Sequence, residues 1–303
     1  MRKNLDVYLY GMTVLSTIHR LKGPYPETDT YQEIDRTYIV PVGETGNAAI
    51  LLARLGLQAR PEGSWLGRQT KKELLSFNRK RGVDTSGMKY DASFDGWRDV
   101  VLVDDHHRTV FGWFGGLFSK KGGRRWSKPN AAALRKSKVV SIDPFFGLDS
   151  EKAARLCRAN GKPFVTMDCL PESSCHRYSA VNVLSQSFLR SLAPKASFEN
   201  LMKRYRTKSQ GLTIFTFGAK SIWYARPQGK IHRFTPYRVK ISGTLGAGDS
   251  FRAGMVYGLW RGWSDERSIR FAAGLAACVC RKFPAALHPP ALREVFRLTG
   301  SMK

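Results

Sequence analysis

Gly243-Thr244-Leu245-Gly246-Ala247-Gly248-Asp249-Ser250-Phe251 is the most informative stretch of the chain, and it directly precedes a segment with the apolar spacing of a helix. Its three small residues let the backbone turn tightly and approach a ligand closely. Their amide groups would lie at a helix N-terminus, where anions are favoured. A carboxylate in the next position, Asp249, is suited to take a proton from a hydroxyl that attacks a phosphoryl group. A helix cap with a tight turn is the plainer interpretation, and the complete nine-residue pattern favours the phosphoryl site.

Strand-like and helix-like segments alternate along most of the chain around this stretch. Apolar runs predict strands at 5–12, 58–66, 139–143, 163–168 and 212–217. Amphipathic spacing predicts helices at 46–55, 70–81, 150–159, 250–260 and 265–281. This alternation predicts an α/β fold with a mainly parallel central sheet flanked by helices.

Two segments, at about 30–42 and 96–114, interrupt this alternation. Both contain β-forming residues that alternate with polar ones, and neither has a helical pattern. In the second segment a polar turn at 104–108 predicts a hairpin. The two segments together predict a small separate β-sheet, either a lid over a site or a surface for oligomerisation.

The composition restricts the class of protein. The 303 residues include 50 Lys and Arg against 24 Asp and Glu, a formal net charge of +26, which favours encounters with anions. The chain contains no run of 18 apolar residues, so the sequence predicts no membrane-spanning helix. Trp126 is the one aromatic candidate for stacking in a basic stretch, so we expect non-specific polyanion binding and no dedicated nucleic-acid site. Five cysteines without paired spacing predict a reducing, cytoplasmic location.

Residues 243–251 closely resemble the C-terminal signature of the ribokinase-like (PfkB) carbohydrate kinases. The segment Gly43-Glu-Thr-Gly-Asn47-Ala-Ala resembles the family's N-terminal signature, and Thr216-Phe-Gly218-Ala-Lys220 is similar to its ATP-approaching Thr-x-Gly segment. The resemblance covers nearly the whole chain. It implies a single ribokinase-like domain over 1–303, in which segments 30–42 and 96–114 form a lid.

The resemblance implies transfer of the γ-phosphoryl group of ATP, with Mg²⁺, to a hydroxyl of a sugar, polyol, sugar acid or nucleoside-like compound. Asp249 matches the catalytic base, and the amides of Gly246, Ala247 and Gly248 match the anion hole. The implied nucleotide-binding residues are Thr216, Gly218, Lys220 and Thr244. The implied acceptor-binding residues are Ser16, Gly43, Asn47, Arg98 and Asp143, of which Asp143 has a helix cap or a loop position as its alternative role. Asn182 is the implied metal residue.

Three carboxylates of the family pattern are absent. Ser16 replaces an Asp that commonly binds substrate hydroxyls, and Ser185 replaces the Glu of an Asn-x-x-Glu motif that begins at Asn182. Gly243 replaces an Asp that helps to hold potassium in activated members, which argues against a monovalent cation. The pattern fits an altered, less hydroxyl-rich or anionic acceptor, and Arg98 also favours an acidic or phosphorylated one. It equally fits a catalytically impaired kinase fold kept for nucleotide binding or as a scaffold. The lid further predicts a homodimer.

Overall fold

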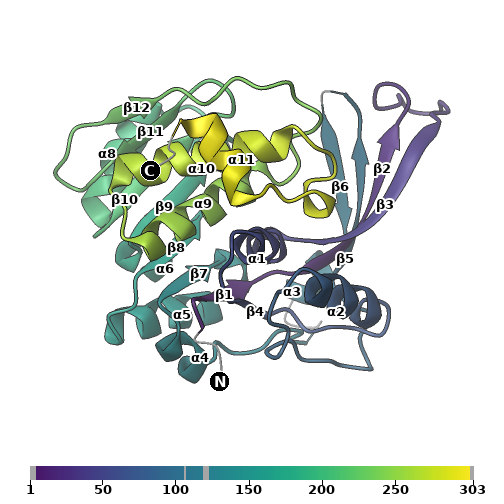
Figure 1. The fold of residues 1–303 in the computed structure, drawn as a ribbon, viewed down its shortest axis with the longest axis horizontal. Coiled ribbons are helices and arrows are strands. Elements are labelled where there is room, and N and C mark those ends of the chain that lie inside the picture. Colours follow the sequence, from purple (N-terminus) through teal and green to yellow (C-terminus); the bar gives the residue numbers. More distant parts are fainter. Residues whose placement is uncertain (1–4, 106, 119–122, 301–303) are drawn as a thin grey trace.

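Two sheets organise residues 5–105, 107–118 and 123–300, which are the residues that the computed structural model describes (Figure 1). The larger sheet has eight strands in the order β12-β11-β10-β9-β8-β7-β1-β4. The strands from β4 to β10 are parallel, whereas β11 and β12 are antiparallel additions at one edge. Their bounds are β1 (Val7–Gly11), β4 (Ala59–Gly63), β7 (Val139–Ile142), β8 (Phe164–Met167), β9 (Val181–Ser185), β10 (Leu212–Thr216), β11 (Ile222–Ala225) and β12 (His232–Phe234).

Helices cover both faces of this sheet, as the alternating pattern predicts. The α-helices are α1 (Glu44–Arg54), α2 (Lys71–Lys80), α3 (Gly115–Phe118), α4 (Ala131–Lys136), α5 (Leu148–Ala159), α6 (Ser174–Tyr178), α7 (Gln186–Leu192), α8 (Phe198–Lys208), α9 (Ala247–Arg261), α10 (Asp265–Cys280) and α11 (Leu292–Thr299). Short 3-10 turns, η1 (Pro144–Phe146) and η2 (Ala285–Leu287), follow β7 and precede α11. In the described ranges no helix is both long and apolar enough to cross a bilayer.

The central strand β1 shows how the two faces are filled. All five of its residues are buried, and successive side chains point to opposite faces. Val7 and Leu9 belong to the core that packs against α1, α9 and α10. Tyr8 and Tyr10 belong to a second core, which packs against α4 and α5. A strand covered on both faces is apolar throughout, and this explains why its sequence signal is strong.

The smaller sheet has the order β3-β2-β5-β6, with bounds β3 (Ile34–Val42), β2 (Val14–Leu21), β5 (Arg98–Val103) and β6 (Arg108–Gly112). The two extended segments predicted at 30–42 and 96–114 are therefore strands, and β5 and β6 form the predicted hairpin. Residue 106, in its predicted turn, lies outside the described residues. The sequence did not predict β2, which begins three residues after β1 ends and pairs with both β3 and β5. This short connection places the small sheet beside the C-terminal edge of the large one.

The predicted nucleic-acid candidate, Trp126, is committed to internal packing. Its ring stacks on Phe146 with centroids 5.1 Å apart, and its Nε1 donates to Asp149 at 2.9 Å. One face of its ring is therefore occupied by Phe146. The five cysteines are all unpaired thiols, four of them buried.

Candidate functional site

A cleft of about 790 Å³ lies between the C-terminal edge of the large sheet and one face of the small sheet. It is lined by strand ends and loops of the large sheet, by the start of α1 and α9, and by residues of all four strands of the small sheet. In open parallel sheets, ligands bind at this edge. Most of the predicted site residues line it: Ser16, Gly43, Asn47, Thr216, Gly218, Thr244, Gly246, Ala247, Gly248 and Asp249.

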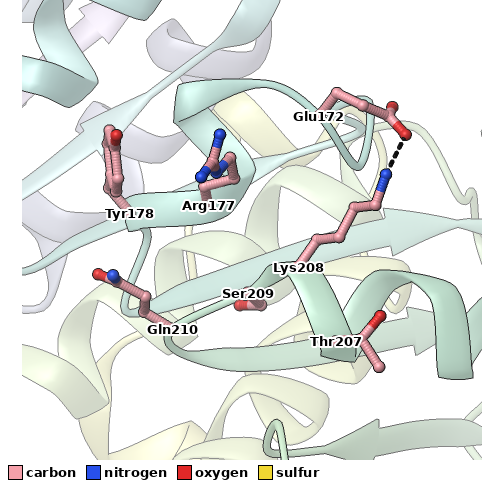
Figure 2. Close-up of a pocket in the computed structure, with 7 residues that line it drawn as sticks. All are labelled: Glu172, Arg177, Tyr178, Thr207, Lys208, Ser209 and Gln210. Atoms are coloured by element: carbon pink, nitrogen blue, oxygen red, sulfur yellow. Dashed lines mark hydrogen bonds and ion pairs between the residues drawn. The ribbon is translucent and has the colours of Figure 1, made fainter.

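A second hollow contains none of the predicted site residues (Figure 2). Glu172 lies at its rim, and hydrogen bonds from Lys208 and Arg204 lower the pKa of this carboxyl to about 2. The group is satisfied by exposed cations, as in an ordinary surface ion pair. The chemistry that the sequence predicts is therefore concentrated in the larger cleft.

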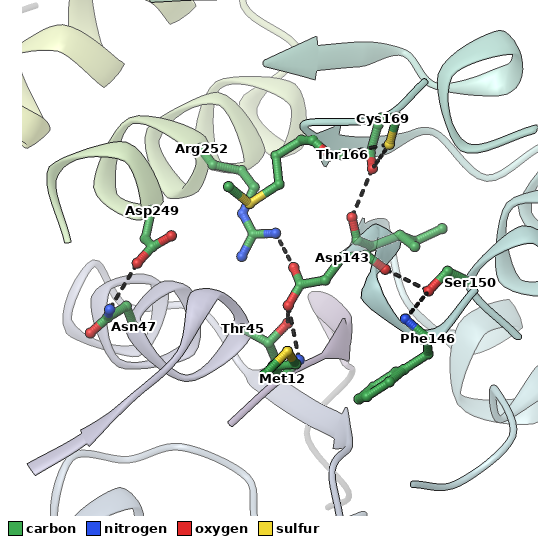
Figure 3. Close-up of polar contacts among 12 residues, drawn as sticks. Met12, Thr45, Asn47, Asp143, Phe146, Ser150, Thr166, Cys169, Asp249 and Arg252 are labelled. Atoms are coloured by element: carbon green, nitrogen blue, oxygen red, sulfur yellow. Dashed lines mark hydrogen bonds and ion pairs between the residues drawn. The ribbon is translucent and has the colours of Figure 1, made fainter. Parts of the chain in front are cut away.

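The start of α9 has the geometry expected of an anion site. Gly246 caps the helix in the left-handed conformation, with φ of 82°, which glycine adopts without steric cost. The amide of Ala247 donates to the Thr244 carbonyl at 3.1 Å, so this predicted anion-hole donor is already engaged in the turn. Gly248, in the first turn, has no acceptor within its own helix. Asp249 follows, and the Nδ2 of Asn47 donates to its Oδ2 at 2.8 Å (Figure 3).

Charges around Asp249 control its protonation. Burial raises the pKa of Asp249, while the Arg252 guanidinium and the Asn47 hydrogen bond oppose this rise. Arg252 lies one turn further along α9, so both side chains are on the same face of the helix. Glu44, at the start of α1, also lines the cleft. Burial, followed by repulsion from Asp249 and Asp143, raises the pKa of Glu44 to about 8.

Asp143, a predicted acceptor-binding residue, is instead buried beneath the cleft. It is 0% exposed, and its carboxylate is hydrogen-bonded to the equally buried Arg252. The Met12 amide and the Thr45 hydroxyl both donate to its other oxygen at 2.9 Å (Figure 3). A side chain at Gly11 would overlap this carboxylate, which explains the glycine at the end of β1. Asp143 therefore does not line the cleft, and its burial favours the alternative role of a loop residue.

Three of the four predicted nucleotide-binding residues lie in the cleft. Thr216, Gly218 and Thr244 line the cleft, whereas Lys220 is exposed in the turn after β10 and does not. In that turn the amide of Lys220 donates to the Phe217 carbonyl at 3.1 Å. Lys220 would need a different conformation to meet a ligand in the cleft.

The predicted metal residue Asn182 does not reach the cleft either. It is 0% exposed within β9, and its Nδ2 contacts the Nδ1 of His176 at 2.9 Å. Three residues later, Ser185 ends the strand and does line the cleft. Its amide and its hydroxyl donate to Asp168 at 2.7 and 3.0 Å, so Asp168 supplies a carboxylate close to the position where Glu was expected. Burial raises the pKa of Asp168, while the hydrogen bonds from Ser185 oppose the rise.

Arg98 is displaced from the cleft by strand alternation. Its guanidinium lies over the Trp113 ring, 5.3 Å from the centroid, and donates to Gln69. Its neighbour Asp99 points the other way and lines the cleft. Arg98 is thus not among the residues that line the cleft, and its role in acceptor binding stays a prediction. By contrast, Gly43 (φ 82°) is where predicted, and a Cβ there would lie 2.8 Å from the Met12 carbonyl.

The position of Gly243 leaves little room for the missing carboxylate. A Cβ at this residue would lie 2.6 Å from the Phe283 ring, and its amide donates to the Cys280 carbonyl at 3.3 Å. The expectation of no monovalent-cation activation stays a prediction, and this packing is consistent with it.

Sequence reasoning missed five charged residues of this region: Asp99, Arg108, Asp168, Arg190 and Arg252. Arg252 had a usable signal, since it is three residues after Asp249 and thus on the same helix face. Asp168 is the last residue of a predicted strand, at the sheet edge where ligands bind. Asp99 had no signal, because only the pairing of β2 with β5 brings it to the cleft.

The comparisons with known proteins agree with this arrangement. A model of the pfkB family of carbohydrate kinases matches residues 7–291. The 5-dehydro-2-deoxygluconokinase of Shouchella clausii is 23% identical over 279 residues, covering 84% of this chain and 84% of its own. The nucleoside kinase of Methanothermobacter thermautotrophicus is 25% identical over 296 residues, covering 92% and 90%. The structure of Arabidopsis thaliana ribokinase complexed with ribose and ATP matches with a TM-score of 0.79 at 16% identity, covering 98% of this chain and 99% of that one. The predicted ribokinase-like fold is confirmed.

Proposed function

Because the chain belongs to the pfkB family of carbohydrate kinases, and is a phosphotransferase with a hydroxyl acceptor, we propose that Asp249 and the start of α9 carry out its reaction. The acceptor is a sugar, polyol, sugar acid or nucleoside-like compound, and the donor is ATP. The ribokinase match, whose structure holds ribose and ATP, supports this pairing of ligands.

In the proposed reaction the acceptor hydroxyl gives its proton to the Asp249 carboxylate as its oxygen bonds to the γ-phosphorus of ATP. The bond from that phosphorus to the bridging oxygen breaks, and ADP leaves. Asn47 orients the base through its hydrogen bond of 2.8 Å, and Arg252 favours its ionised form. The amides of Gly246 and Gly248, at the positive end of α9, stabilise the charge that develops on the transferred group.

We propose that the phosphates of ATP lie between α9 and the strand ends of β9 and β10, near Thr216, Gly218 and Thr244. The described residues contain no group of three or more His, Cys, Asp or Glu side chains able to hold a metal ion. Mg²⁺ is commonly held by one or two carboxylates together with substrate phosphates, and Asp168 fits such a partial site. When bound, the ion would neutralise phosphate charge.

One observation carries this proposal: the Asn47–Asp249 pair stands in the cleft at the glycine-rich start of α9. We would measure ADP release from MgATP against sugars, polyols, sugar acids, sugar phosphates and nucleosides. Asp249→Asn should lower the acceptor-dependent rate by about 100- to 10,000-fold, as expected for loss of a general base. The control, Asp265→Asn, removes an exposed carboxylate paired with Arg226 outside the cleft and should leave the rate unchanged.

The absent carboxylates favour one alternative, an impaired kinase fold that still binds nucleotide. MgATP binding without turnover of any acceptor would support it and would refute the proposed reaction. An acceptor-dependent rate that Asp249→Asn leaves intact would refute the role of Asp249 alone.

We also propose that the small sheet is a lid and the contact of a homodimer. Its outer face carries a row of paired residues across all four strands, Ile39, Thr17, Val100 and Phe111. Ile39 and Phe111 are 58% and 45% exposed, an apolar surface that a second copy could cover. The cytoplasmic location stays a prediction, to which the unpaired thiols are suited.

A further inference from the structure

On the cleft face of the small sheet, one polar row of paired residues lies between two apolar rows, and arginines occupy the row beyond them. Val14 pairs with Val42 at one end, and Ile18 pairs with Tyr38 and Val101 further along. Between these rows, Val40 pairs with Ser16, Ser16 with Asp99, and Asp99 with Gly112. Adjacent partners in a sheet point to the same face, so Ser16 and Asp99 lie side by side above the cleft.

The polar atoms of this pair are unsatisfied. Ser16 is 0% and Asp99 is 8% exposed, and neither the Ser16 hydroxyl nor Oδ1 of Asp99 has a hydrogen-bond partner among the described residues. The strand neighbours of Asp99 on its two sides are Ser16 and Gly112, neither of which carries a charge. Burial raises the pKa of Asp99 to about 6. A buried carboxyl oxygen without a hydrogen-bond partner destabilises a fold. A ligand that donates a hydrogen bond to this oxygen offsets that penalty, which favours binding.

We propose that Asp99, assisted by Ser16, binds a hydroxyl of the acceptor at the small-sheet side of the cleft. This inference rests on the proposed function. Ser16 occupies the position at which the resemblance expected a carboxylate, and Asp99 supplies that carboxylate from the adjacent strand. The carboxylate is thus present on the neighbouring strand, at the position that pairs with Ser16.

This placement specifies the class of acceptor. An ionised carboxylate accepts hydrogen bonds and cannot donate them, so it selects hydroxyl or amino groups and repels carboxylates and phosphates. Arg108 also lines the cleft, and it pairs with Val103 of β5. Val103 lies four residues from Asp99 along the strand, which is about 13 Å at strand spacing. The acceptor therefore presents a neutral hydroxyl to Asp99, separate from the hydroxyl that is phosphorylated. A polyhydroxylated sugar, polyol or ribose moiety meets this requirement.

The test compares wild type, Asp99→Asn and Ser16→Ala, using the acceptor that gives the highest rate in the panel above. Asp105→Asn is the control, since this exposed carboxylate of the same hairpin pairs with Arg20 outside the cleft. Asp99→Asn keeps the shape and removes the charge, so the KM for acceptor should rise about 10- to 100-fold while the KM for ATP stays within about twofold. Acceptor analogues that each lack one hydroxyl locate the contact. With wild type, the analogue that lacks the contacting hydroxyl should raise the acceptor KM by about the same factor as Asp99→Asn does. With Asp99→Asn, that analogue should raise the KM little further.

Calorimetric titration of acceptor in the presence of a non-hydrolysable ATP analogue gives a second readout and should show the same loss of affinity. Should Asp99→Asn fail to fold, Ser16→Ala decides the matter through a several-fold rise in acceptor KM. An unchanged acceptor KM, or an equal rise in the KM for ATP, would overturn this inference and leave the kinase proposal standing. Absence of any acceptor-dependent turnover by wild type would overturn both.

Discussion

The buried ion pair between Asp143 and Arg252 offers the sharpest test of the energetics of this site. Both side chains are 0% exposed. Arg252→Met keeps most of the apolar stem and removes the charge, which leaves Asp143 with the Met12 amide and the Thr45 hydroxyl as its remaining donors. Removing one partner of such a pair strands an uncompensated charge in the interior, which typically costs about 3–5 kcal/mol.

That free energy converts into a measurable change in melting temperature. An unfolding entropy of about 2.1 cal/mol/K per residue gives roughly 0.6 kcal/mol/K for this chain. The expected loss of about 3–5 kcal/mol thus lowers Tm by about 5–8 °C, measured by calorimetry at pH 7 without ligand. The double variant Asp143→Asn/Arg252→Met removes both charges, and the amide oxygen that it introduces at position 143 can still accept from both remaining donors.

The double variant should therefore recover most of the lost stability, because it leaves no uncompensated charge in the interior. Two nitrogens of Arg252, Nε and Nη2, already lack hydrogen-bond partners among the described residues, so no hydrogen bond is lost from them with the guanidinium. A fall in Tm below about 2 °C for Arg252→Met, or a double variant no more stable than either single one, would refute this reasoning.

Three further predictions concern other parts of the molecule. Glu44→Gln should be more stable than wild type by an amount that grows from pH 5 to pH 8. A carboxyl whose pKa is raised to about 8 in the folded state destabilises the fold progressively as the pH rises above the pKa of the unfolded state. Urea unfolding at several pH values measures this difference in stability, and a constant difference would contradict the prediction. Ile39→Lys with Phe111→Lys should give a monomer in light scattering if the small sheet joins two copies, and a monomeric wild type would contradict the dimer. Binding to random-sequence DNA should weaken by more than about 100-fold between 50 and 200 mM salt and show no sequence preference, since it rests on the charge of +26; salt-insensitive binding would indicate a dedicated site.

The sequence was most informative where chemistry is concentrated in a short segment. The nine residues 243–251 predict a helix start, an anion-binding turn and a carboxylate together, and residues 244–249 line the cleft at the start of α9. Strands covered on both faces were equally clear, since burial on both sides makes them apolar throughout. The partnership of Asn47 with Asp249 spans 202 positions of sequence, and only the resemblance connected the two residues.

The roles of the other charged residues depended on pairing that no local pattern encodes. Arg98 and Asp99 are adjacent in sequence, and the register of β5 against β2 decides that Asp99 faces the cleft. Asp143 follows a strand end in the way a ligand-binding residue does, yet the approach of α9 brings Arg252 onto it and leaves it fully buried. Local patterns were therefore enough to predict the fold and to single out the candidate base, because both signals lie within short segments. Which carboxylates face the cleft depends on strand register and helix packing, because these bring together residues whose sequence positions bear no relation to one another.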